Sequence, residues 1–321
     1  MKKLLLPCLI MALTFVSCHK DEIESQSSDI TIAPTARKCA SMELLAIQLK
    51  NDPAMADRML QIESFTNKVL KEHKAARLVN GVIEIPVVVN VLYRTAAENI
   101  SDTQIQSQID ALNEDYNATN ADFTLVPATF SGVKANVGIR FVLDQTVRKS
   151  TNKRSWNTND YMKISSRGGI DPTSSATKLN LWVCTLSNDI LGYAQFPGGA
   201  SATDGVVILN TAFGRTGTAA APFNKGRTAT HEVGHWLNLR HIWGDATCGT
   251  DYVNDTPLHN TANYGCPAAG HKSTCTGTPV EMTMNYMDYT DDACMYMFSN
   301  GQKSRMLATF VSGGPRYSFA Q

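Results

Sequence analysis

The residues with the clearest chemical potential are two histidines and a glutamate in the run His231-Glu232-Val233-Gly234-His235. Positions i and i+4 share one face of a helix, so both imidazoles can bind the same metal ion. Imidazole nitrogen is a common zinc ligand, and a neighbouring carboxylate can take a proton from water. The run therefore predicts a zinc hydrolase site with Glu232 as the general base.

A third histidine, His241, follows six residues after His235. It can reach the same ion only if the helix ends and the chain turns back. Asn238 lies in this interval, and asparagine is one of the few non-glycine residues that tolerate a left-handed backbone. We therefore expect a helix break at Asn238 and zinc bound by His231, His235 and His241. Zinc with three protein ligands keeps a fourth position open for chemistry.

The elements that must position these residues are predicted from hydrophobic periodicity. Residues 83–93 are rich in β-branched side chains and predict a central strand. Further strands are expected at 139–143, 179–183 and 204–209. A capped helix follows Ser101, the stretch 244–283 lacks periodicity, and a closing helix follows Ser299 and runs through Phe310. This order predicts an α+β domain in two halves, the second one irregular.

The composition limits the classes of partner. Apolar residues make up 43% of the chain and charged residues 18%, which is typical of a globular protein. Lysine and arginine total 29, as do aspartate and glutamate, so the net charge is zero. Because binding to phosphates needs clustered basic residues, we expect no nucleic-acid partner.

The N-terminus has the pattern of an export signal. Lys2 and Lys3 precede an apolar run that is too short to span a bilayer, so residues 1–17 predict a signal peptide. The residues before Cys18 resemble a bacterial lipobox, in which the cysteine is lipidated; the alternative is an ordinary signal with a chance cysteine. Residues 18–38 are polar and predict a tether. We expect an outer-membrane or cell-surface lipoprotein, or a protein secreted after processing, with membrane contact only through lipid.

Together with a distant methionine, the histidine pattern resembles the metzincin metallopeptidases. The context is most similar to the pappalysin family, and the resemblance covers about residues 82–310. The matching stretches are Gly192-Tyr193-Ala194, Asp204-Gly205-Val206-Val207, 230–237, Asp255-Thr256-Pro257, Asn285-Tyr286-Met287-Asp288-Tyr289 and 298–306. One departure is Asn238, which replaces the family's usual glycine and costs about 1 kcal/mol of backbone strain.

The resemblance implies a secreted or surface-anchored zinc endopeptidase. It implies a metzincin-like domain with a twisted, mostly parallel sheet, and a monomer. Met287 would form a structural floor beneath the zinc ligands, and Tyr289 would help to bind the oxyanion. Gly192, Tyr193 and Ala194 would pair with extended peptide substrates, a mode that depends little on sequence. Specificity cannot be read from the sequence, although Asp288 or a neighbouring acidic residue would favour arginine after the scissile bond.

Four cysteines cluster in the irregular half: Cys248, Cys266, Cys275 and Cys294. In an exported protein they are expected to form disulfides, and spacing alone allows three pairings. The resemblance implies Cys248–Cys275 and Cys266–Cys294. A structural zinc site is the rival interpretation, but it lacks the usual Cys-x-x-Cys spacing.

Cys39 precedes the catalytic domain, between Lys38 and a segment with helical periodicity that breaks at Asn51-Asp52-Pro53. Flanking Arg37 and Lys38 would favour its thiolate, which is a good zinc ligand. The family resemblance implies a cysteine switch. We hypothesise that residues 39–77 form a helical pro-segment that is cut near Ala76-Arg77, and that residues 78–321 form the catalytic domain. The alternative is an unpaired surface cysteine.

Asp251, Asp255 and Thr256 place oxygen ligands close together in the irregular half. Hard oxygen ligands suit calcium, and the family resemblance also implies calcium here; a hydrogen-bonded turn is the alternative.

Two other functions remain open from the sequence. The chain could be a catalytically silent surface binding protein on a peptidase fold, although Glu232 and the three histidines are all present. It could also be a zinc hydrolase of non-peptide substrates or an exopeptidase, which would need a charged anchor for a chain end.

Overall fold

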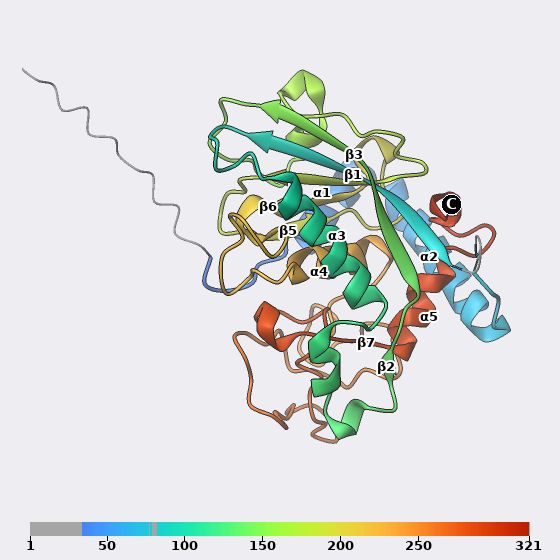
Figure 1. Cartoon of the computed structure of the whole chain (residues 1–321). Coiled ribbons are helices and arrows are strands. Elements are labelled where there is room, and N and C mark those ends of the chain that lie inside the picture. Colours follow the sequence, from blue (N-terminus) through green and yellow to red (C-terminus); the bar gives the residue numbers. More distant parts are fainter. Residues whose placement is uncertain (1–33, 77, 79–81, 321) are drawn as a thin grey trace, which may run out of the picture. The chain divides into compact units, whose positions relative to one another are not determined.

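The computed structural model describes residues 34–76, 78 and 82–320. Its centre is a five-stranded sheet in the order β3-β1-β4-β6-β5, in which only β5 runs antiparallel to its neighbour (Figure 1). The strands are β1 (Ile83–Tyr93), β3 (Ile139–Ser150), β4 (Leu179–Cys184), β5 (Gly192–Ala194) and β6 (Val206–Leu209). The mostly parallel sheet agrees with the predicted fold class.

The central strands are buried because helices and loops cover them. Every residue of β4, β5 and β6 is buried, as the near-continuous apolar runs require. Strand β3 is longer than the sequence predicted, since it pairs with β1 as far as Tyr93 opposite Ser150. The second half of β3 is polar and partly exposed, so hydrophobic periodicity did not predict it as a strand.

Two helices cover one face of the sheet: α3 (Asp102–Tyr116) and α4 (Arg227–Trp236), which contact each other and the sheet (Figure 1). Ser101 caps α3 by accepting a hydrogen bond from the backbone of Gln104. The Gln104 side chain does not complete a capping box; it donates instead to the carbonyl of Phe213, 2.9 Å away. This contact joins the start of α3 to the loop that precedes α4.

The C-terminal half below α4 is largely irregular. It contains the short pair β2 (Lys134–Ala135) and β7 (Phe298–Ser299), followed by α5 (Asn300–Ala308). Ser299 and Gln302 form the capping box that starts α5, which ends at Ala308 instead of running through Phe310.

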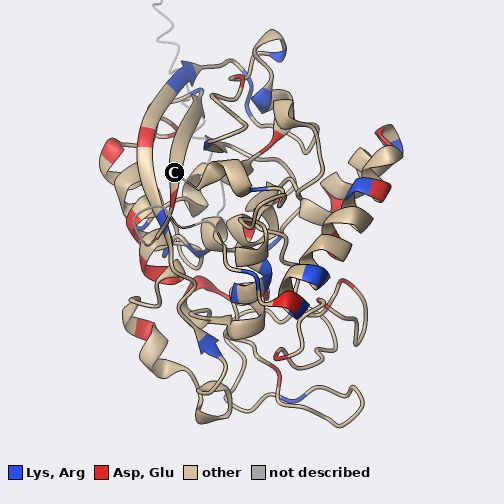
Figure 2. Ribbon diagram, turned by 90° about the vertical axis from the view of Figure 1, so that its right-hand side faces the viewer, with Lys and Arg blue, Asp and Glu red and all other residues tan. Residues whose placement is uncertain are grey.

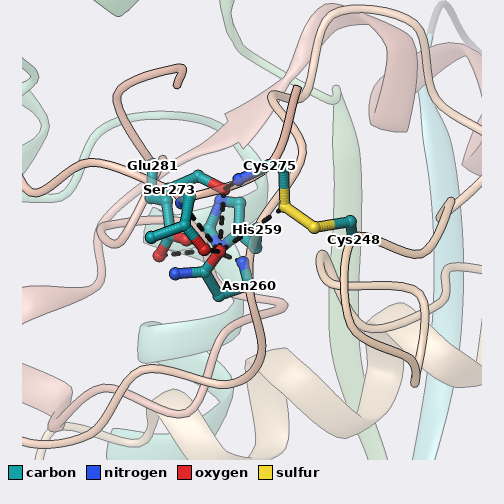
Figure 3. Close-up of a disulfide and its surroundings, with 7 residues drawn as sticks. Cys248, His259, Asn260, Ser273, Cys275 and Glu281 are labelled. Carbon is teal, nitrogen blue, oxygen red and sulfur yellow. Dashed lines mark hydrogen bonds and ion pairs between the residues drawn. A yellow bond between two sulfur atoms is a disulfide. The ribbon is translucent and has the colours of Figure 1, made fainter. Parts of the chain in front are cut away.

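Two disulfides stabilise this half, Cys248–Cys275 and Cys266–Cys294, which is the pairing that the resemblance implied. Figure 3 shows the first of them beside the buried His259. The loop around His259 is fixed by Glu281, which accepts a hydrogen bond from the backbone of Asn260 at 2.8 Å. The irregular loops are thus held by cross-links and buried polar contacts.

The N-terminal segment forms two helices, α1 (Ser41–Asn51) and α2 (Ala54–Glu72), separated at the predicted break. Figure 1 shows α2 beside α5, and the two helices are in contact. Leu44 of α1 belongs to the main hydrophobic core, whereas Leu45, Met55 and Val69 form two smaller clusters with residues of the rest of the chain. Both helices are therefore held against the rest of the chain by apolar contacts.

Several predictions fall on residues that the structure does not describe: the signal peptide, Cys18, most of the tether and Arg77. Within the described ranges, no helix combines the length and apolar character needed to cross a bilayer. Acidic and basic residues are interspersed along the ribbon (Figure 2).

Candidate active site

The Nε2 atoms of three buried histidines converge on one point. Nε2 of His235 lies 3.2 Å from that of His231 and 3.1 Å from that of His241. The Nδ1 atom of each ring lies beside an oxygen. That of His231 is 2.7 Å from the Tyr286 carbonyl, and that of His235 is 2.8 Å from the Leu239 carbonyl. That of His241 is 2.5 Å from the Asp245 carboxylate. Because carbonyl oxygens only accept, the Nδ1 atoms of the first two rings carry the proton.

This arrangement fits a metal ion. Burial lowers the pKa of His231 and His235 well below the usual range, so both rings are neutral. Their Nε2 lone pairs then point at one another, an unfavourable contact unless a cation lies between them. Oriented imidazoles whose other nitrogen donates to an oxygen are characteristic of zinc ligands. The donor set is that of a zinc site with an open fourth position.

The turn after α4 brings the third imidazole to the other two. Asn238 adopts a left-handed conformation with φ of 71°, which the sequence anticipated. The backbone of Leu239 then donates to the carbonyl of Gly234 at 2.9 Å, which closes the turn. His241 follows directly on the returning chain.

Met287 lies beneath the helix that carries the ligands and is fully buried. A Cβ placed on Gly234 would lie only 2.5 Å from the Met287 sulfur. The methionine can approach because position 234 has no side chain. The family resemblance implied that Met287 lies beneath the zinc ligands. The role of Gly234 was not predicted, because its position between the two histidines is its only distinguishing feature in the sequence.

The start of α4 is fixed by a buried ion pair that sequence reasoning did not identify. Nε of Arg227 lies 3.1 Å from the carboxylate of Asp115 on α3, and both side chains are buried. The same carboxylate accepts a 2.6 Å hydrogen bond from Thr230, one residue before His231. The pair therefore sets the rotation of the helix that presents the ligands.

Glu232 is buried, and burial raises its pKa to about 7. Its Oε2 accepts hydrogen bonds from the Ser41 hydroxyl at 2.9 Å and from the Cys39 thiol at 3.2 Å. Both donors come from the N-terminal segment. That segment thus contacts the predicted general base directly.

Cys39 joins the three histidines in one buried cluster, whose ligand atoms all lie within 4.8 Å of one another. Residues 38–40 run parallel to β5: the Leu191 amide donates to the Lys38 carbonyl at 2.9 Å, and the Ala40 amide donates to the Gly192 carbonyl at 3.0 Å. Ser41 then accepts a hydrogen bond from the Ala194 amide at 2.8 Å. The strand expected to bind substrate therefore carries the chain's own N-terminal segment.

The expectation that flanking basic residues favour the Cys39 thiolate is wrong. Burial, followed by the charge of Glu232, raises the pKa of the Cys39 thiol well above its usual range. Lys38 points away, to the carbonyl of Asn188, and Arg37 enters a separate pocket. A cation bound by the histidines would stabilise a thiolate at this buried position.

The guanidinium of Arg37 is almost fully buried. It donates to Asp292 at 2.6 Å, to the Thr228 hydroxyl at 3.2 Å and to the Thr290 carbonyl at 3.1 Å, with Phe223 against its face. Sequence reasoning missed this pocket because its walls lie far apart in the chain.

Asp288 does not line the Arg37 pocket. It is buried, and its carboxylate accepts hydrogen bonds from the backbone amides of Asn263 and Tyr289, both at 2.8 Å. The carboxylate that pairs with Arg37 is that of Asp292, four positions further on.

Tyr289 lies beside the histidine cluster. Its hydroxyl donates to the Cys39 carbonyl at 3.2 Å, and its ring packs edge-on against those of His241 and Trp243. The hydroxyl thus binds a peptide carbonyl next to the metal position.

The three residues predicted to bind calcium are not gathered around one point. Thr256 donates to both carboxylate oxygens of Asp251, at 3.0 and 2.9 Å. Asp255 instead accepts from the Ser299 hydroxyl at 2.6 Å and the Gly301 amide at 2.8 Å, at the start of α5. Without an ion, Asp251 and Thr256 thus form a hydrogen-bonded turn.

Comparisons with known proteins agree with this geometry. The profile of peptidase family M43, described as pregnancy-associated plasma protein-A, matches residues 145–311. An extracellular metalloprotease of Verticillium alfalfae is 33% identical over an alignment of 244 residues, and the match covers 71% of this chain and 79% of the relative. Another from Pyricularia oryzae is 31% identical over 311 residues, covering 94% of this chain and 98% of the relative.

Solved structures match as well. Mature mirolysin of Tannerella forsythia, in complex with a cleaved peptide, is 45% identical with a TM-score of 0.72, covering 74% of this chain and 96% of mirolysin. A promirolysin mutant from the same organism is 41% identical with a TM-score of 0.79, covering 88% of this chain and 97% of that one. The chain therefore belongs to the pappalysin family of metzincins and is a zinc metalloendopeptidase.

Proposed function

We propose that this chain is the latent precursor of an exported endopeptidase whose pro-segment, residues 39–77, blocks its own active site. The observation that carries the proposal is the position of Cys39, whose sulfur completes a four-residue ligand set with His231, His235 and His241. A thiolate on zinc would fill the open position. The pro-segment also contacts Glu232 and occupies the edge of β5.

The extent of the pro-segment has independent support. The promirolysin structure covers 88% of this chain and mature mirolysin 74%, a difference of 14%, or about 45 of 321 residues. A segment of residues 39–77 has a similar length. The extracellular relatives support export, and lipidation of Cys18 stays part of the proposal.

In the mature enzyme, bound zinc would supply Lewis-acid chemistry to the peptide carbonyl and to water. Glu232 would accept the proton of the attacking water on its carboxylate and pass it to the leaving amine. The Tyr289 hydroxyl, which here donates to the Cys39 carbonyl, would donate to the oxyanion of the substrate. Extended peptides would replace residues 38–40 along β5.

We also propose that the Arg37 pocket selects arginine side chains of substrates. In the present structure a buried carboxylate lies 2.6 Å from the guanidinium of Arg37, and two threonine oxygens each accept a further hydrogen bond from it. Charge-assisted recognition of this kind favours arginine over neutral side chains.

Calcium binding at Asp251 and Thr256 stays a proposal, supported only by their clustered oxygens. An ion would replace the hydrogen bond between the two side chains.

Digestion of casein by the processed protein tests the proposed catalytic role. Glu232→Gln keeps the shape of the side chain but removes the base, so activity should fall by about 10³-fold while bound zinc stays stoichiometric. Removal of zinc with a chelator should abolish activity, and zinc should restore it. Activity of Glu232→Gln equal to that of the unchanged enzyme would refute the assignment of the base.

A further inference from the structure

The catalytic domain has a second contact surface for the pro-segment, apart from the Cys39 contacts. We define it as the docking surface, formed by Phe196, Arg240, Arg305, Ala308 and Val311. Two small apolar clusters meet there. Leu45 and Met55 pack on Phe196, and Phe65 and Val69 pack on Ala308 and Val311.

An ion pair lies between these clusters. Nη1 of Arg305 lies 3.0 Å from Oε1 of Glu63, and Nη2 lies 2.8 Å from Oε2, so the contact is bidentate. The Arg305 side chain is 1% exposed and that of Glu63 is 26% exposed. Among the residues that the structure describes, Glu63 is the only carboxylate in ion-pair contact with Arg305. A pair this well shielded is stronger than an exposed one.

The docking surface accepts a helix at close range. A Cβ on Gly198 would lie 3.3 Å from the Ile62 side chain, so the missing side chain lets α2 approach. The Gly198 carbonyl accepts a hydrogen bond from Arg58 at 2.7 Å. The residues of α2 that face the domain (Met55, Met59, Ile62, Glu63, Thr66 and Val69) recur at helical spacing.

The docking surface also adjoins the active site. The Phe196 ring lies 5.2 Å from that of the ligand His235, and it stacks under the guanidinium of Arg240, the residue before the ligand His241. A segment bound to the docking surface would therefore be held close to the cleft.

Removal of the pro-segment would leave two guanidinium groups beside an exposed apolar floor. Resting on the proposed function, we infer that the mature enzyme uses the docking surface as an exosite. Its partner is an amphipathic helix of a protein substrate, with one carboxylate among apolar residues spaced as in α2. Two observations support this inference. A carboxylate on the partner helix would complement the charges of Arg305 and Arg240, and the structure already has a helix bound at this surface.

Three reporter peptides test it with the processed enzyme unchanged. In each peptide, a Gly/Ser linker joins the same arginine-containing cleavable sequence to the sequence Ala54–Glu72. The helix sequence is native in the first peptide, carries Glu63→Gln in the second and carries Glu72→Gln in the third. Glu72 is the matched control, because its side chain is 42% exposed and forms an ion pair with the neighbouring Lys74. All assays contain the same concentration of a helix-promoting cosolvent. Circular dichroism is used first to check that the three peptides have equal helicity under these conditions.

The native reporter should have a KM about tenfold lower than the Glu63→Gln reporter, with the same kcat, and Glu72→Gln should behave like native. Excess free helix should raise the KM of the native reporter but leave cleavage of the bare peptide unchanged. Equal KM values for the three reporters, or inhibition of bare-peptide cleavage by the free helix, would overturn the exosite. Because the bare peptide reports catalysis alone, failure of the exosite and failure of the proposed function are distinguishable.

Discussion

The Ser41 hydroxyl donates a 2.9 Å hydrogen bond to Oε2 of Glu232, the same oxygen that the Cys39 thiol contacts. The proposed pro-segment therefore contacts both the metal position and the residue expected to move the proton. The proposed latency would then have two parts, and each can be removed by a separate substitution.

Cys39→Ala should give a precursor that activates without the normal lag, because nothing then fills the open ligand position. The matched control is Cys184→Ala, because Cys184 is also a buried free cysteine and lies inside β4. The lag is measured as the delay before cleavage of an arginine-containing peptide. An unchanged lag in Cys39→Ala would exclude the cysteine as the switch.

Ser41→Ala should weaken latency less than Cys39→Ala. It removes the hydrogen bond to the carboxylate, worth about 1.5–3 kcal/mol, but leaves the thiol in place. The uncut precursor should therefore gain about tenfold in residual peptide cleavage. Equal residual activity in Ser41→Ala and the unchanged precursor would show that the contact is structurally incidental.

Gly234→Ala should destabilise the fold by about 1–3 kcal/mol, because the new Cβ would overlap the Met287 sulfur at 2.5 Å. Gly132→Ala is the control, since a Cβ there meets nothing within 4 Å. Chemical denaturation and zinc content are the measurements. Adding Met287→Ala to Gly234→Ala should restore part of the lost free energy of unfolding. If the double variant instead lost as much free energy as the two single variants added together, the contact would not be the cause.

Asp292→Asn should lower kcat/KM for arginine-containing peptides about 100-fold, while peptides with a neutral residue at that place change little. The neighbouring Asp291→Asn removes the same charge, but Asp291 is only partly buried and accepts none of the hydrogen bonds that the Arg37 side chain donates in the structure. The ratio of the two kcat/KM values is the readout, because a general loss of folding would lower both. An unchanged ratio would place arginine selection elsewhere.

Calcium and pH should act on the same group, Asp251. Without an ion, burial raises its pKa to about 6 from 3.8, so the folded protein prefers the protonated form. The free energy of unfolding therefore falls by up to about 3 kcal/mol as the pH rises from 3.8 to 6. It rises again by the same amount on acidification. Calcium binds the charged form and should remove this slope.

Denaturant unfolding between pH 4 and 8, with and without calcium, measures the slope. Asp251→Asn should remove both the pH dependence of this group and the response to calcium. If added calcium leaves the unfolding curves of the unchanged protein the same at every pH, the loop is a hydrogen-bonded turn alone.

Much of the site follows from local rules that the sequence displays. The helical period places His231 and His235 on one face, and the asparagine at 238 permits the left-handed turn that leads to His241. The strand β1 and the cap at Ser101 follow equally from local composition. These features depend on a few neighbouring residues, so an isolated sequence is enough to predict them.

Other features depend on which distant residues meet. Arg37 and Asp292 are 255 positions apart, and Ser41 and Glu232 are 191 apart, so no local pattern connects them. The sequence suggested a thiolate at Cys39 from its basic neighbours, yet the fold buries the thiol beside Glu232 and sends Arg37 elsewhere. The sequence by itself determined the ligand types and the turn. Only the tertiary structure decided what surrounds them, because burial and charge are properties of packed neighbours.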